Sequence, residues 1–188
     1  MGLKIYQSRT LDELIDGLRK NDSRSQKMVY ERFAPTMFAV SLRYVKDQDN
    51  AQDVLVKGFM KVFSNILQYK GDGSFEGWVR RIMVNEALMF LRKNKNMSVE
   101  VDIEEARDTA ASTYDHLEAE DLLSLVQQLP IGYRTVFNLY AIEGYSHAEI
   151  ANMLNISEGT SKSQLSRAKQ LLRQLLDRLD PSYQDQIG

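Results

Sequence analysis

Apolar residues recur along this chain at alternating spacings of three and four, and this period restricts the fold more than any other feature. The last such block contains Leu165, Ala168, Leu172, Leu175 and Leu179, which step by 3, 4, 3 and 4. A helix of 3.6 residues per turn aligns such positions on one face, whereas a strand needs strict alternation, which is absent. With only three prolines in 188 residues, the pattern predicts an all-α protein.

The same period predicts several further helices. One covers the run from Tyr30 to Tyr44, where Pro35 indicates either a kink or a helix that starts near it. A second follows over about 51–67, and a third begins near Phe75, after a glycine-bearing loop over 69–74 in which Ser74 is the expected cap. Shorter helices are expected before Pro130, over 136–142 and over 146–154, and a long one over 158–179.

The charge distribution divides the chain into three parts. Residues 1–97 carry 17 Lys and Arg against 11 Asp and Glu, residues 98–121 carry one against nine, and residues 122–188 carry six of each. Helical periodicity also fails over 94–117. We therefore expect two small helical domains, 1–93 and 118–188, joined by a flexible acidic linker over 94–117.

The composition excludes several kinds of site. With no cysteine and two histidines, thiol catalysis and cysteine-bound zinc are excluded and a site with several histidine ligands is not expected. The chain shows no apolar run long enough to span a membrane, and its start lacks the apolar core of a signal peptide, so a cytoplasmic protein is expected. No cofactor or metal is implied.

The final block has the pattern of a helix-turn-helix, in which 155–157 form the turn. If Leu165, Ala168 and Leu172 point inward, the opposite face of the last helix carries donors suited to base edges and phosphates. These residues are Lys162, Ser163, Ser166, Arg167, Lys169 and Arg173. A solvated helix in a bundle is the alternative.

Two blocks of sequence resemble the extracytoplasmic-function sigma factors. The run over 144–169 is similar to the promoter-binding C-terminal domain of that family. Motifs over 30–35, 49–55, 59–63 and 74–85 follow the order and spacing of its N-terminal domain. The resemblance implies a promoter-recognition subunit of bacterial RNA polymerase, without catalytic activity, whose C-terminal domain reads the minus-thirty-five element.

The resemblance also implies roles for the N-terminal domain, which melts and reads the minus-ten element. Carried over by position, the residues expected at the non-template strand are Lys70, Ser74, Phe75, Arg80, Arg81 and Asn85. Core packing is the alternative for Phe75 and for Trp78. The helix over 49–67 would bind the polymerase clamp through Asp49, Gln52, Asp53 and Lys57. An anti-sigma factor is a further possible partner, which would cover both domains.

The chain departs from the family pattern at three places. Val56-Lys-Gly-Phe59 stands where the family usually has Gln-Glu-Thr-Phe, which reverses a charge on the surface expected to meet the polymerase. Ser161 stands where Val is frequent and Gln164 where Arg is common, and both substitutions could alter promoter choice.

Other readings remain open. The acidic linker is either a solvated tether or a segment that follows the RNA exit path and imitates nucleic acid. A conventional helix-turn-helix regulator would bind duplex DNA without polymerase. A helical enzyme is disfavoured, because no phosphate-binding glycine loop or Glu-x-x-His pair is present, and a structural adaptor is disfavoured by the basic helix face.

Overall fold

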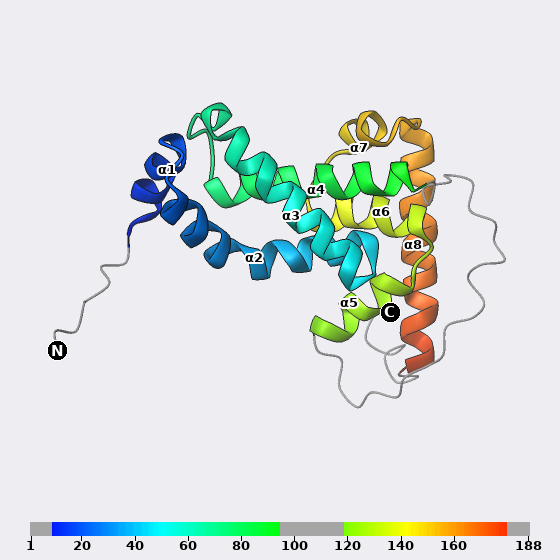
Figure 1. Ribbon diagram of the computed structural model, residues 1–188. Helices are drawn as coiled ribbons and strands as arrows, with labels where there is room; N and C mark the ends of the chain where they lie inside the picture. The colour runs from blue at the N-terminus through cyan, green and yellow to red at the C-terminus, as the bar shows by residue number, and fades with distance from the viewer. Residues whose placement is uncertain (1–8, 95–118, 180–188) are drawn as a thin grey trace. The chain divides into compact units, whose positions relative to one another are not determined.

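The computed structural model describes residues 9–94 and 119–179. They form helices and no strand within those ranges, as the apolar period predicts (Figure 1). In chain order the elements are α1 (Leu11–Arg19), α2 (Ser23–Val45), α3 (Gln48–Ser64), the 3₁₀ turn η1 (Ile66–Gln68), α4 (Phe75–Lys93), α5 (Ala119–Gln128), α6 (Ile131–Phe137), the π-helical turn η3 (Asn138–Ile142), α7 (His147–Leu154) and α8 (Glu158–Leu179).

The chain divides into two compact units. Unit 1 comprises α1, α3, η1 and most of α2 and α4, whereas unit 2 comprises α5 to α8 with the end of α4 and residues 43–46, which are the last three residues of α2 and the one after it. The expected linker, 94–117, lies outside the described residues except for Asn94, so it stays a prediction. No helix in the described part of the chain is both long and apolar enough to cross a membrane.

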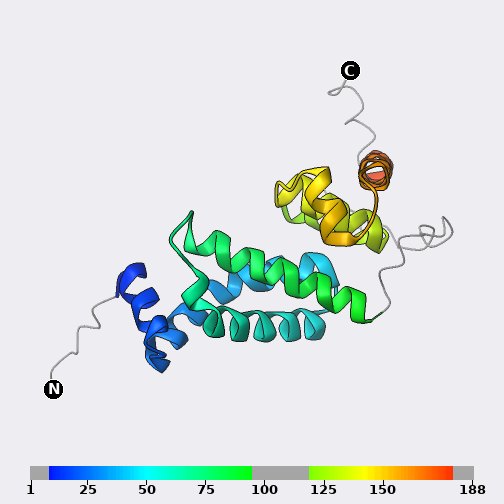
Figure 2. The same cartoon turned by 90° about the horizontal axis from the view of Figure 1, so that it is seen from above.

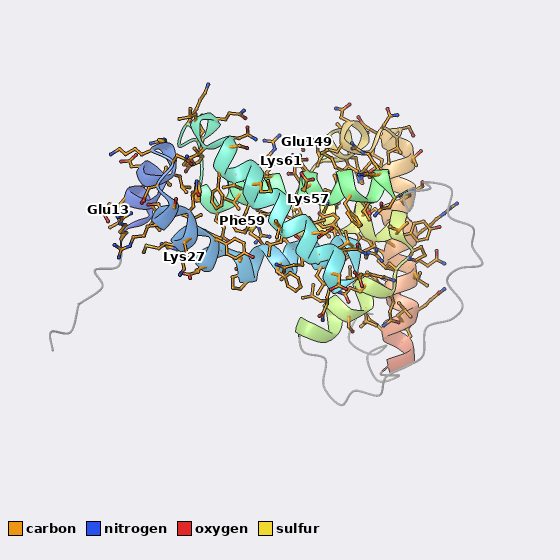
Figure 3. The ribbon with its side chains drawn as sticks, viewed as in Figure 1. Glu13, Lys27, Lys57, Phe59, Lys61 and Glu149 are labelled. Carbon is orange, nitrogen blue, oxygen red and sulfur yellow. The ribbon has the colours of Figure 1, made fainter. Side chains whose placement is uncertain are left out.

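Aromatic side chains join the helices of unit 1. The Phe59 ring on α3 lies 4.8 Å from that of Tyr30 on α2, and the Phe33 ring lies 5.7 Å from that of Phe75 (Figure 3 labels Phe59). Helices α3 and α4 run side by side, as Figures 1 and 2 show. They approach closely because residue 58 is glycine, so that the Met83 side chain fills the space beside it.

Helix α1 is an element that our sequence analysis did not predict. It begins with a capping box, in which the Thr10 hydroxyl accepts from the Glu13 N–H and the Glu13 carboxylate accepts from the Thr10 N–H. It buries Leu14, Ile15 and Leu18. The spacing of these residues and the Thr-x-x-Glu pattern are signals that could have located it.

Two details of the expected helices need correction. Helix α2 starts at Ser23, well before Pro35, which lies inside the helix, so the proline does not mark its beginning. The helix expected over about 51–67 ends earlier, because α3 ends at Ser64 and the chain continues as a 3₁₀ turn, in which Leu67 is 76% exposed. The change of helix type rotates Leu67 off the face that buries Ile66.

The core of unit 2 forms where α8 packs on α5 and α6. Its buried members are Leu125, Val126, Leu129, Tyr133, Ala168 and Leu172. Figure 2 views α8 almost along its axis, with α6 and α7 on one side of it. The seam predicted for the last helix is therefore confirmed at Leu165, Ala168 and Leu172, while Leu175 is partly buried.

Candidate nucleic-acid interface

Serine caps and a left-handed residue build the two-helix motif of unit 2. Ser146 and Glu149 form a capping box at the start of α7, where the Ser146 N–H donates to Glu149 Oε2 at 2.8 Å. Asn155 adopts a φ of 55° and ends α7. The Ser157 hydroxyl accepts from the Thr160 N–H at 2.9 Å and caps α8. A three-residue turn thus joins α7 to α8, which is the geometry of a helix-turn-helix.

The outward face of α8 is the strongest candidate for DNA contact. The six donors expected there, Lys162, Ser163, Ser166, Arg167, Lys169 and Arg173, are all exposed. They lie opposite the buried Leu165, Ala168 and Leu172. Lys162 forms an i,i+4 ion pair with Glu158 at 3.8 Å, at a surface where such pairs contribute little stability. The lysine can therefore exchange this partner for a phosphate at small cost.

The two departures on α8 lie on its buried side. Ser161 is 0% exposed and Gln164 is 5% exposed, so neither side chain belongs to the outward face. The Ser161 hydroxyl lies 2.9 Å from Nδ1 of His147 on α7. If these two residues affect promoter choice, they do so through the packing of α8 and not through direct contact with a base.

A glycine loop precedes α4 in unit 1. Gly71 and Gly73 both have a φ of 88°, a conformation that glycine adopts without strain. The Tyr69 hydroxyl donates to the Gly73 carbonyl at 2.9 Å and closes the loop, and the Ser74 hydroxyl accepts from the Gly77 N–H at 3.0 Å, as expected of a cap. Lys70 and Ser74 are exposed, so both can reach a strand that passes the loop.

Phe75 lies in the core and not on the loop surface. It is 2% exposed, and its ring lies within 5.8 Å of the rings of Phe33, Tyr69 and Trp78. The alternative of core packing therefore describes Phe75 better than stacking on an unpaired base. The Phe75 ring packs against the Tyr69 ring, and the Tyr69 hydroxyl in turn holds the loop through its bond to Gly73.

The basic residues of α4 differ in exposure. Arg81 and Asn85 are exposed and, being four residues apart, share one helix face. Arg80 is half-buried and pairs with Glu76 at 3.8 Å. These three residues of α4, together with Lys70 and Ser74 of the loop, form a polar surface that begins at the loop and continues along α4.

Helix α3 presents a mixed apolar and charged face. Asp49, Gln52, Asp53 and Lys57, the residues expected at the polymerase, are all exposed (Figure 3 labels Lys57). Lys57 pairs with Asp53 at 3.6 Å. Our sequence analysis missed two apolar residues among these polar ones. Val56 is 44% exposed and Met60 is 66% exposed. Their positions, outside the buried stripe and four residues apart, are the signal that could have found them.

The departure at Gly58 has a packing explanation. A Cβ built on Gly58 would lie 2.2 Å from the Met83 Sδ, and Met83 is fully buried. A threonine at this position would need the space that the thioether occupies. Glycine in place of threonine at position 58 thus leaves room for the Met83 side chain inside unit 1, and this substitution does not change the outer face of α3.

Over 9–94 and 119–179, no three His, Asp or Glu side chains gather as metal ligands would.

Comparisons with known proteins agree with both parts of this geometry. Residues 29–97 match the family described as Sigma-70 region 2, and residues 119–172 match Sigma-70, region 4. The chain is 30% identical to RNA polymerase sigma factor SigV of Bacillus subtilis over 145 residues, covering 77% of this chain and 87% of that one. It is 28% identical to the RNA polymerase sigma-H factor of Pseudomonas aeruginosa over 182 residues, covering 89% and 94%.

Two solved structures share the fold. The sigma factor RpoE of Bartonella quintana, solved with the anti-sigma factor NepR, superposes with a TM-score of 0.51 at 24% identity, covering 80% of this chain and 96% of that one. CnrH, solved with the cytosolic domain of CnrY, superposes with a TM-score of 0.50 at 20% identity, covering 89% and 97%. These likenesses support the fold.

Proposed function

Because the chain belongs to the extracytoplasmic-function group of the sigma-70 family of RNA polymerase sigma factors, we propose how its two units divide promoter recognition. A sigma factor directs the polymerase core enzyme to promoters, and both regions of the family are present here. Unit 1 binds the core enzyme and the minus-ten element, and unit 2 binds the minus-thirty-five element. The protein works in the cytoplasm, uses no cofactor and catalyses no reaction of its own.

The outward face of α8 is the observation that carries this proposal. Six donors are exposed along it, and the other side of the helix is fixed to α5 and α6 by the unit 2 core. A helix presented in this way fits the major groove. There Arg and Lys recognise guanine, and a Ser hydroxyl can bond a donor or an acceptor on a base edge. Lys162 and Arg167 are both exposed and are five residues apart, so they lie on opposite sides of this face.

The loop and α4 surface of unit 1 receives the unpaired strand. Lys70, Arg80 and Arg81 bind phosphates, while Ser74 and Asn85 offer hydrogen bonds to a base edge. Gly71 and Gly73 carry no side chain, and nothing lies within 4 Å of where a Cβ would stand at either, so a strand can approach the backbone at these two positions. The buried Phe75 does not contact the strand; it positions Tyr69, which holds the loop.

The exposed face of α3 binds the polymerase core enzyme. Val56 and Met60 supply exposed apolar area in the described part of the chain, and Asp49, Gln52, Asp53 and Lys57 surround it. An apolar centre with a polar rim is the usual anatomy of a protein interface. The reversed charge at Lys57 favours an acidic group on the clamp at that point.

An anti-sigma factor is a second partner of this proposal. RpoE was crystallised with the anti-sigma factor NepR. A partner that covers the α3 face would block the core enzyme, so the prediction is competition between the two for Val56 and Met60.

A regulator that acts without polymerase is the rival function. It would need a sensing or dimerising bundle in place of unit 1, whereas residues 29–97 match a sigma region. No comparison supports the rival.

Transcription from a genomic promoter library with core polymerase, in the presence and absence of this protein, tests the proposal. We expect a defined set of promoters to start only when the protein is added. Tight DNA binding by the chain alone, with no association with the core enzyme, would favour the rival instead.

Two variants then test the α8 face. Lys162→Ala or Arg167→Ala is expected to weaken binding by about 1–3 kcal/mol and to relax preference at one base pair if a base contact is lost. A lost phosphate contact would weaken all sequences alike and reduce the salt slope by about one. Unchanged binding in both variants would remove the assignment.

A further inference from the structure

A partly buried polar contact joins the two helices of the helix-turn-helix. The Ser161 hydroxyl on α8 lies 2.9 Å from Nδ1 of His147, the first residue of α7. Ser161 is 0% exposed. The hydroxyl of a serine inside a helix ordinarily points to solvent or donates to the carbonyl four residues earlier. Here the Ser157 carbonyl accepts the Ser161 N–H at 3.0 Å, and the Ser161 hydroxyl reaches across to another helix.

A third element contacts the face of the His147 imidazole ring. The Tyr140 ring stacks on the His147 ring, with centroids 4.5 Å apart and planes 20° from parallel. Tyr140 comes from η3, where the Glu143 N–H donates to the Asn138 carbonyl five residues earlier. His147 is therefore held by a ring against its face and a hydroxyl at its edge. Its orientation is determined by η3, α7 and α8 together.

This contact lies directly behind the outward face of α8. Ser161 is the residue before Lys162, and Leu165 follows it by one turn on the same buried side. Apolar packing at Leu165 allows small rotations of the helix, whereas a hydrogen bond requires a donor and an acceptor within about 0.5 Å of one separation. Rotating α8 by roughly 10° would move its outer side chains by about 1 Å, given a helix radius of about 5–6 Å.

We infer that His147 and Ser161 form a positioning pair, which sets the rotation of α8 and thereby its preference among minus-thirty-five sequences without touching DNA. The inference rests on the proposed function of α8. Displacements of about 1 Å are enough to weaken a bidentate base contact. Contacts to phosphates tolerate such displacements better, because long Lys and Arg side chains can follow a point charge. The pair therefore governs discrimination more than overall binding.

The experiment uses the full chain with core polymerase on two promoter libraries. One library randomises the minus-thirty-five element and the other the minus-ten element. Ser161→Ala removes the hydroxyl, and His147→Phe keeps a ring against Tyr140 but removes the hydrogen bond. His147→Asn retains a polar atom at the Nδ1 position. Ser124→Ala, at an exposed serine of α5, is the matched control.

We expect Ser161→Ala and His147→Phe each to reduce discrimination between the best minus-thirty-five element and its single-base variants by roughly 5-fold, a part of what one mismatch costs. Preference at the minus-ten element should not change. Combining the two variants should cause no further loss, since both remove one contact. His147→Asn should restore most of the discrimination, and Ser124→Ala should resemble the unchanged protein.

Three outcomes would overturn the inference. If all variants keep full discrimination, the contact only satisfies a buried hydroxyl. If His147→Phe lowers all sequences alike and reduces the salt slope while Ser161→Ala has no effect, His147 contacts a phosphate directly. If the losses of the two variants add, they do not act as a pair. Ser161→Cys, which has nearly the shape of serine but only a weak hydrogen-bond donor, repeats the test should Ser161→Ala fail to fold.

These outcomes are distinct from failure of the proposed function. A protein that gives no promoter preference with core polymerase before any substitution contradicts the role of α8 itself. A protein that discriminates normally, and whose variants do the same, contradicts only the positioning pair.

Discussion

Two helical glycines have opposite surroundings. A Cβ on Gly17 of α1 would lie 2.0 Å from the Ser25 Oγ and 2.6 Å from the Ser25 Cβ. The Ser25 Cβ is fixed to the backbone of α2 and cannot move aside as the end of a long side chain can. A Cβ on Gly159 of α8 would meet only the Ser157 Oγ, at an ordinary 3.6 Å.

Alanine at these two positions should therefore change stability in opposite directions. Gly17→Ala is expected to lower the free energy of unfolding by about 1–3 kcal/mol through overpacking. Gly159→Ala should raise it by about 0.4–1 kcal/mol, because alanine restricts the unfolded chain. Urea denaturation of both variants measures this. Equal effects at the two sites would show that helix propensity alone decides them.

Phe75 provides a second test at this scale. Phe75→Ala should destabilise unit 1 by about 3–5 kcal/mol, the usual cost of removing a buried aromatic ring. Phe75→Leu should cost less, since it fills part of the space. A thermal melt beside permanganate footprinting of an open promoter measures both. A variant with unchanged melting but slower strand opening would instead assign the ring to a base.

The sequence predicted exposure better than it predicted contacts between segments. The helical period placed all six donors of α8 outward, because one helix decides that pattern by itself. The burial of Phe75 depends on Phe33 and Tyr69, which come from other segments, so no local pattern reports it. Ser161 stands four residues before Leu165, and its burial was available from the same period.

At the scale of elements, the corner between α1 and α2 is held by one carboxylate. The Asp22 Oδ2 accepts from the Ser25 hydroxyl at 2.7 Å, from the Arg9 guanidinium at 2.8 Å and from the Ser25 N–H at 3.1 Å. Hydrogen bonds from Ser25 and then Arg9 hold the pKa of Asp22 well below its ordinary value. The charged form is therefore favoured in the folded protein.

A depressed carboxyl pKa makes the corner sensitive to acid. The stabilisation is complete above the unfolded pKa of about 4, decreases as the pH falls below that value, and is fully lost only below the lower pKa of the folded state. Asp22→Asn, which keeps a capping side chain, should cost more stability at pH 7 than at pH 3. Urea denaturation at both values measures the difference. An equal loss at both would mean that the cap, and not the charge, is what matters.

Element boundaries followed from caps where caps were recognised. Ser74 caps α4 as expected, and the helix start expected at 146 agrees with Ser146 as the N-cap of α7, since these roles depend on residues within three or four positions. The start of α2 was not predicted, because Pro35 was taken to indicate either a kink or a helix that starts near it, whereas α2 starts at Ser23. Its actual start depends on Asp22, whose carboxylate accepts the Ser25 N–H.

At the scale of the whole molecule, binding to the core enzyme and binding to DNA should be separable. Met60→Lys, at a side chain that is 66% exposed, should weaken association with core polymerase and leave stability within about 0.5 kcal/mol. Arg167→Ala should leave core association intact and weaken upstream DNA binding. Sedimentation with core enzyme and binding of a promoter duplex measure the two. Loss of both functions in either variant would contradict a division between units.

The assignment of a partner to each of the two units was predictable only from the resemblance. The helical period identifies helices but does not say which bundle meets which partner. The linker over 94–117 was inferred from its charge and lack of periodicity, and it stays a prediction.

The aromatic cluster beneath the glycine loop also has an optical consequence. Trp78 is the single tryptophan of the chain, and its ring lies 5.5 Å from Tyr69 and 5.8 Å from Phe75. Tyr69 is also the residue whose hydroxyl closes the loop. Any strand that displaces Tyr69 changes the surroundings of the indole, so intrinsic fluorescence reports loop movement in this protein without an added dye.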